Sequence, residues 1–60
     1  MKMRWFRVSR NGGRTAVRAF TVQEALERYA AFNGELSVYP GTTVTEITEE
    51  EASEYYYRIA

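Results

Sequence analysis

The chain has 60 residues, a length that supports one small hydrophobic core and a single domain spanning residues 1–60. It contains no Cys, His or Asp, which excludes disulfides, thiolate zinc sites and the usual histidine base of an enzyme. Hydrophobic residues make up 45% of the chain, enough for a compact core, and no apolar run approaches the length of a membrane span. We therefore expect a soluble cytoplasmic protein that does not enter a membrane.

The charged residues are divided unevenly along a chain whose formal net charge is zero. Every charged side chain within residues 1–20 is basic, whereas residues 21–60 hold all eight acidic residues beside Arg28 and Arg58. Such asymmetry is typical of an anion-binding patch, and it equally allows the two parts of the fold to complement each other. The basic residues of the first part are Lys2, Arg4, Arg7, Arg10, Arg14 and Arg18.

Residues 3–10 and 14–20 are predicted to form a β-hairpin, because Asn11-Gly12 supplies the positive φ angles that a tight turn requires. Alternation along the strands predicts one face for the core and leaves large apolar groups among guanidinium groups on the other. The core face consists of Phe6, Val8, Val17 and Ala19. The other face consists of Met3, Trp5, Arg7, Ser9, Ala16, Arg18 and Phe20, and another element or a partner is needed to cover it.

A capping box predicts a helix that begins after Thr21. The Thr21 hydroxyl can accept from the N–H of Glu24, while the Glu24 carboxylate can reach back to the N–H of Thr21. Gly34 suits the left-handed position that ends a helix. Helical spacing predicts an apolar stripe formed by Val22, Ala25, Leu26, Tyr29, Ala30 and Phe32.

The second part of the chain is predicted to contain one more strand and one more helix. Residues 42–48 are rich in β-branched side chains, and Thr48 and Glu51 form a second capping box. The helix that begins there is expected to run to the C-terminus, with Ala52, Tyr55, Tyr56 and Ile59 as its apolar stripe. Residues 36–39 are extended, and a fourth, edge strand at this segment is an open alternative.

The order strand, strand, helix, strand, helix predicts a small two-layer α+β domain. A connection through the first helix makes the third strand parallel to the second, and the third strand pairs most simply with the first. We therefore predict a three-stranded sheet in the order 2-1-3. Both helices are expected on one face of this sheet, which leaves the other face open.

The reactive side chains that remain show no recognisable catalytic arrangement. Two carboxylate pairs, Glu24 with Glu27 and Glu46 with Glu50, have the spacing of an ordinary solvated helix face. Residues 49–51 are all Glu, and acids in the first turn of a helix are favoured by the helix dipole without any metal. The sequence therefore predicts no enzyme, no cofactor and no metal site.

The basic and aromatic hairpin face carries the strongest functional signal. Guanidinium groups pair with phosphates and Trp offers a stacking surface, so an open sheet with Trp5, Arg7 and Arg18 resembles surfaces that hold single-stranded nucleic acid. The structural alternatives are a cation–π pair between Trp5 and Arg18, and arginines that meet Glu of the second helix. We favour these alternatives, because a domain that binds nucleic acid through charge is ordinarily basic overall.

Three consecutive tyrosines, residues 55–57, give a second signal. One helix cannot turn all three toward its core, so Tyr57 is predicted to be exposed. Exposed Tyr is enriched at protein interfaces, although one exposed Tyr at a chain end is equally ordinary. In size and style the chain resembles short proteins of phages and other mobile elements, several of which are compact α+β inhibitors or adaptors. The resemblance covers no motif, so it implies no site residue in this chain.

Together these features favour a non-enzymatic interaction module that binds a macromolecular partner, most simply a protein or a second copy of itself. The alternative is single-stranded nucleic-acid binding through the basic and aromatic hairpin face. The residues predicted to bind the partner are Trp5, Arg7, Arg14, Arg18 and Tyr57.

Overall fold

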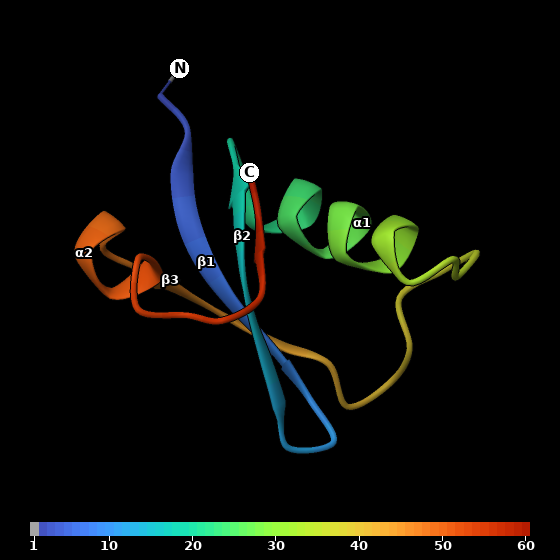
Figure 1. The fold of residues 1–60 in the computed structure, drawn as a ribbon. Coiled ribbons are helices and arrows are strands. Elements are labelled where there is room, and N and C mark those ends of the chain that lie inside the picture. The colour runs from blue at the N-terminus through green and yellow to red at the C-terminus, as the bar shows by residue number, and fades with distance from the viewer. Residues whose placement is uncertain (1) are drawn as a thin grey trace.

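A computed structural model describes residues 2–60 as a small α+β domain built on a four-stranded mixed sheet (Figure 1). In chain order, its elements are β1 (Arg4–Arg10), β2 (Gly13–Ala19), α1 (Val22–Phe32), β3 (Thr43–Ile47), α2 (Glu49–Ala52) and β4 (Arg58–Ile59). The strand order is β3-β1-β2-β4. This order confirms the arrangement predicted for the first three strands and adds β4 beside β2.

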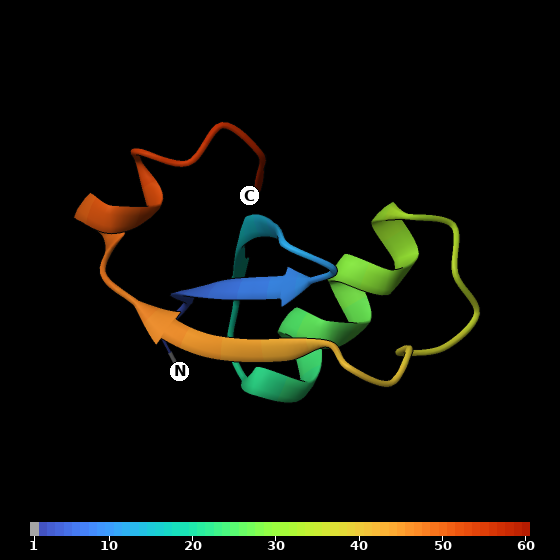
Figure 2. The same ribbon diagram turned by 90° about the horizontal axis from the view of Figure 1, so that it is seen from below.

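The hairpin of β1 and β2 forms as predicted. Asn11 and Gly12 have φ angles of 53° and 81°, and Arg10 pairs with Gly13 to close the two-residue turn. β1 is also antiparallel to β3, so β2 and β3 run parallel on either side of it, as the connection through α1 predicts. β3 forms one edge of the sheet (Figure 2).

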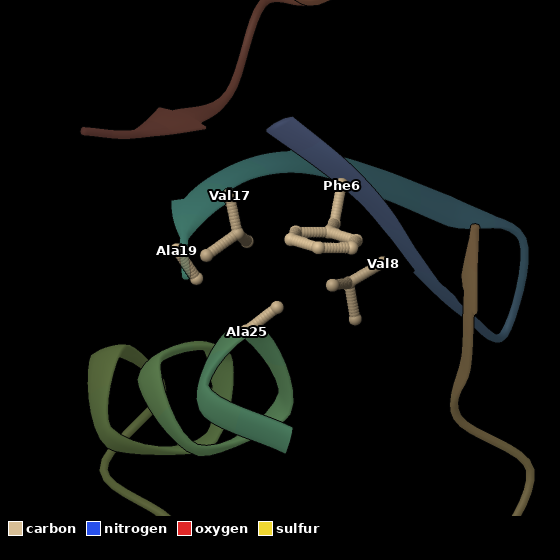
Figure 3. Close-up of a cluster of buried hydrophobic side chains, with 5 residues drawn as sticks. All are labelled: Phe6, Val8, Val17, Ala19 and Ala25. Atoms are coloured by element: carbon tan, nitrogen blue, oxygen red, sulfur yellow. The ribbon is translucent and has the colours of Figure 1, made fainter. Parts of the chain in front are cut away.

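The main core lies between the sheet and α1. Phe6, Val8 and Val17 are fully buried there, which confirms the predicted core face of the hairpin. Ala25 of α1 points into the same cluster from the helix side (Figure 3). The small side chain at this position allows the helix backbone to approach the strands closely, so a short helix suffices to cover them.

Capping at the start of α1 follows the prediction with one change. The Thr21 hydroxyl accepts from the N–H of Glu24 at 3.0 Å, but the Glu24 carboxylate accepts from the N–H of Phe20, at 2.6 Å, and not from Thr21. Gly34 has a φ of 72°, as a left-handed helix end requires.

The predicted apolar stripe of α1 is wrong at both ends. Val22 and Phe32 are 46% and 68% exposed, whereas Ala25 and Ala30 near the middle are buried. The helix crosses a sheet that is only a few strands wide, so its two ends extend past the side chains beneath it. Phe32 is therefore available at the surface.

The second helix does not run to the C-terminus, contrary to the prediction. α2 ends at Ala52, and the Ser53 hydroxyl donates to the backbone oxygen of Glu50 at 2.6 Å. The chain then turns back, and the Tyr57 backbone oxygen accepts from the N–H of Ala16 at 3.0 Å. Pairing as β4 satisfies this outward N–H of β2 and places Ile59 against the core, neither of which a continued helix would do.

The two helices lie on opposite faces of the sheet, not on one face as predicted (Figure 1). Ile47 is the last residue of β3, and it pairs with Trp5 on the face away from α1. α2 begins two residues later, and Ala52 packs with Ile47 and the fully buried Ala16. The direction of the Ile47 side chain therefore decides which face α2 covers.

Residues 36–39, the open alternative for a fourth strand, are irregular. Leu36 is fully exposed, and this segment lies outside the sheet. Across residues 2–60, no helix is both long enough and apolar enough to span a membrane.

Candidate functional site

Four arginines surround Ala16 on the face of the sheet that α2 partly covers. Arg7 and Arg58 are the partners of Ala16 in β1 and β4, and Arg14 and Arg18 lie two residues away on either side in β2. Neither of the two ion pairs formed within residues 2–60 includes any of the four guanidinium groups. Sequence reasoning missed Arg58, because only the parallel pairing of β4 brings it to this face.

The two other arginines of β1 are paired on the α1 face. Arg4 lies 2.9 Å from Glu46 of β3. Arg10 donates to both carboxylate oxygens of Glu35, at 2.8 and 2.6 Å. These hydrogen bonds lower the pKa of Glu35 and raise that of Arg10. Internal complementarity of the two halves thus accounts for Arg4 and Arg10, although the partners come from β3 and a loop and not from α2 as predicted.

A concave region of about 440 Å³ lies between the hairpin and the segment that follows α2. The Arg14 guanidinium carbon lies 5.8 Å from the centre of the Tyr55 ring, a cation–π distance. This pair is found instead of the predicted one between Trp5 and Arg18. The lining residues are Arg7, Arg14, Glu51, Glu54, Tyr55 and Tyr56.

A second concave region, of about 320 Å³, lies beside Arg14 and α1. Tyr29 and Phe32 of α1 line it together with Tyr57. The Tyr56 and Tyr57 rings meet edge to face with centroids 4.8 Å apart. Tyr56 lines the first region and Tyr57 lines the second. Arg14 is common to both linings.

Both regions include Arg14 in their linings, and we name the surface around this residue the Arg14 surface. Tyr57 is 61% exposed, as predicted, but Tyr56 is 89% exposed and does not belong to a helical core stripe. Sequence reasoning missed Phe32, because the helical period alone does not show where a helix extends beyond its sheet. The Arg14 surface consists of Arg7, Arg14, Phe32, Tyr55, Tyr56 and Tyr57.

Trp5 and Arg18 line a different concave region, of about 460 Å³. Trp5 is half-buried and packs against the cluster of Ile47 and Ala52, so its ring also supports α2. Two carboxylates, from Glu46 and Glu49, lie among the basic groups of this region. The five residues predicted to bind a partner are therefore divided between two sites.

The chemistry available at the Arg14 surface is recognition by charge, hydrogen bonding and ring contact. Its side chains are guanidinium, phenol and phenyl groups, and the carboxylates of Glu51 and Glu54 line the same concave region as Tyr55. Within residues 2–60, no three carboxylates gather closely enough to hold a metal ion.

Comparison with protein-family models, with curated proteins and with solved structures found no match to this chain. Its function is therefore inferred from the residues of the chain and their geometry.

Proposed function

We propose that the protein is a non-enzymatic interaction module that binds a protein partner through the Arg14 surface. The observation that carries the proposal is the position of Arg14, which lines two concave regions that each hold aromatic side chains beside polar ones. Protein interfaces are enriched in Tyr, Phe and Arg, and the residues that dominate binding energy sit in pockets near the centre of the patch.

The side chains of this surface define the chemistry of the partner. Phe32 and Tyr57 offer ring surface to an apolar or aromatic side chain, and Arg14 offers a guanidinium group to a carboxylate. Glu51 and Glu54 line one of the two concave regions beside Arg14, so a basic group of the partner finds a counter-charge there. A folded protein surface or peptide with both charges fits this arrangement better than a polyanion.

Single-stranded nucleic acid has weaker support as the partner. The stacking ring expected from the sequence is Trp5, which is half-buried beneath α2. The cations around Trp5 share this concave region with the carboxylates of Glu46 and Glu49, which reduce its attraction for phosphates.

The test is affinity capture of the partner from a cell lysate, with the immobilised wild-type protein and two matched variants. Arg14→Gln removes one guanidinium group from the centre of the Arg14 surface, and Arg18→Gln removes one from the same strand and face outside it. We expect the wild-type protein and Arg18→Gln to retain the same partner and Arg14→Gln to lose it. Tyr57→Ala should weaken the affinity for the captured partner at least tenfold, as a residue that dominates binding energy does.

A nuclease arm separates protein from nucleic acid. We expect capture to survive nuclease treatment, and a labelled single-stranded oligonucleotide to show no binding in an anisotropy titration at low salt. Oligonucleotide binding that Arg18→Gln weakens more than Arg14→Gln would support the Trp5 region as a nucleic-acid site instead. Equal capture by the wild-type protein and Arg14→Gln would contradict the Arg14 surface as the binding site.

A further inference from the structure

The outer edge of β3 is open. Within residues 2–60, the sheet ends at β3 and no strand lies on its outer side (Figure 2). The opposite edge is β4, which has only two residues, so β3 is the longer of the two edges. An open edge strand presents unpaired N–H and C=O groups to any extended segment that meets it.

The sheet register shows which groups point outward from β3. Arg10 and Gly13 close a two-residue turn, and the residues of such a pair exchange both backbone hydrogen bonds. The backbone N–H and C=O groups of alternate residues in β1 therefore point to β2. Arg7 is one of the residues whose backbone groups point to β3 instead, where its partner is Thr45. It follows that Val44 and Glu46 direct their N–H and C=O groups away from the sheet. The Ala16 N–H, which donates outward to Tyr57 at the other edge, confirms this alternation.

In the described part of the chain, no backbone hydrogen bond outside the sheet involves Val44 or Glu46. Natural edge strands are ordinarily protected by charged side chains, especially Lys, by Pro or by a bulge. β3 has the sequence TVTEI, and its one charge, on Glu46, is neutralised by Arg4 at 2.9 Å. Its β-branched residues favour pairing, and β3 contains no Pro, Lys or bulge.

We propose that the β3 edge binds the β3 edge of a second copy of this chain, antiparallel and about a two-fold axis at Thr45. With the axis there, Val44 of one copy lies opposite Glu46 of the other, and these are the residues whose backbone groups point outward. No like charges lie directly opposite each other, because Glu46 faces Val44 and Thr45 faces Thr45. The strand is thus self-complementary in register, in hydrogen bonding and in charge, which selects a second copy as the occupant.

The pairing involves one short strand from each copy, so it should be weak. Interfaces below about 1,200 Å² of buried surface belong to transient complexes, and we expect a dissociation constant on the order of 100 μM. The proposal is independent of the proposed function, because the Arg14 surface includes no residue of β3.

A charge exchange at Thr45 tests the two-fold axis. Thr45 is exposed, so Thr45→Lys and Thr45→Glu each place like charges face to face in a pair of copies without disturbing the core. In sedimentation velocity, we expect the wild-type protein to self-associate as concentration rises, and each variant alone to stay monomeric. An equimolar mixture of the two variants should associate again. Failure of the mixture to associate, with both variants folded, would overturn the symmetric pairing.

A second pair of variants tests the backbone hydrogen bonds. Glu46→Pro removes an outward N–H that has no partner within the sheet, whereas Glu46→Gln keeps it, and both lose the ion pair with Arg4. We expect Glu46→Gln to associate and Glu46→Pro to remain monomeric with a native far-ultraviolet circular dichroism spectrum. A wild-type protein that stays monomeric up to about 1 mM overturns the proposal, since this concentration exceeds the expected dissociation constant about tenfold.

Arg14→Gln distinguishes this edge from the Arg14 surface. If the β3 edge binds the second copy, Arg14→Gln should associate like the wild-type protein. Association that depends on Arg14 and survives Glu46→Pro would instead show that the Arg14 surface binds the second copy, and would overturn the edge pairing.

Discussion

Arg10 holds the irregular segment after α1 against the sheet. Its guanidinium group donates to both oxygens of Glu35 and lies 5.5 and 5.0 Å from the ring centres of Tyr29 and Tyr39. The side chains of Arg10 and Glu35 are 19% and 11% exposed, so this pair is much less accessible to solvent than the Arg4 pair. Less solvent means weaker screening, and we expect the Arg10 pair to contribute more to stability.

The lowered pKa of Glu35 predicts a pH-dependent contribution to stability. The folded chain holds this carboxylate ionised more readily than the unfolded chain, so the contribution is complete above the ordinary value of 4.5 and is lost as the pH falls through the folded value. Glu35→Gln should therefore lower the melting temperature at pH 7, and the difference from the wild-type protein should shrink in more acidic buffer. Thermal melts at several pH values measure this difference.

Glu50→Gln is the control, because Glu50 is exposed and forms no ion pair within residues 2–60. A difference between Glu35→Gln and the wild-type protein that stays constant with pH would contradict the assigned cause.

Phe6 is the largest side chain that is fully buried. Phe6→Ala should destabilise the fold by about 3–5 kcal/mol, because the lost ring contacts and the resulting cavity both cost free energy. A domain of this size typically has a stability of roughly 3–9 kcal/mol, so much of the population should unfold. Urea denaturation measures the change. Tyr56→Ala, at a highly exposed ring, should change stability by less than about 0.5 kcal/mol, and similar losses for both variants would contradict the position of the core.

At the scale of elements, α1 and α2 begin with the same capping geometry but depend on it differently. In each helix a Thr hydroxyl accepts from an N–H three residues later at 3.0 Å. α1 has eleven residues and covers the main core, whereas α2 has four and lies on a small cluster around Ala16. A helix of one turn has no stability of its own, so the cap and the packing of Ala52 must hold α2 in place.

Loss of the two caps should therefore have different consequences. Thr21→Ala should lower global stability by about 1 kcal/mol, the usual cost of losing a cap. Thr48→Ala should release α2 locally and uncover Trp5, which packs beneath it. We expect iodide to quench Trp5 fluorescence more strongly in Thr48→Ala than in the wild-type protein at a denaturant concentration where both are folded. Increased quenching in Thr21→Ala but not in Thr48→Ala would contradict the placement of α2 over Trp5.

At the scale of the whole molecule, Arg28 links the C-terminal segment to the rest of the fold. Its guanidinium group donates to the backbone oxygen of Arg18 in β2 and, at 2.6 Å, to that of Ala60. Arg28 and Glu24 are four residues apart on α1 but form no ion pair within residues 2–60, and Glu24 accepts from the Phe20 N–H instead. The short strand β4 is therefore held in part by Arg28 of α1, which also contacts β2.

Arg28→Gln should loosen β4 while leaving the core folded. The Ala16 N–H, which donates to Tyr57, should exchange with solvent about fivefold faster, the factor expected when a contribution of about 1 kcal/mol is lost. Hydrogen exchange followed by NMR measures this rate. Glu27→Gln, on the same helix and exposed, should leave the Ala16 N–H unchanged, and equal acceleration in both variants would contradict the role of Arg28.

Local patterns by themselves determined much of this protein. The Asn11-Gly12 turn sets the hairpin register, the two Thr caps set where the helices begin, and strand alternation places Phe6 on the core face. These features depend on residues that are close in sequence or directly opposite each other in a hairpin, so their geometry follows from backbone sterics and period. The strand order 3-1-2 followed from the same patterns, because a parallel connection through a helix leaves few arrangements.

Only the tertiary structure decided where α2 ends, which face it covers and which arginines remain unpaired. Each of these depends on contacts between distant segments: Tyr57 with Ala16, Ala52 with Ile47, and Arg10 with Glu35. A capping box marks the start of a helix but carries no information about its length, so the end of α2 could not be predicted from it. The chain after α2 forms β4 because β2 offers an unpaired edge. Arg7, Arg14 and Tyr57 of the Arg14 surface are among the residues predicted to bind a partner. Their assembly required β4 to return beside β2, a pairing between distant segments that no local periodicity encodes.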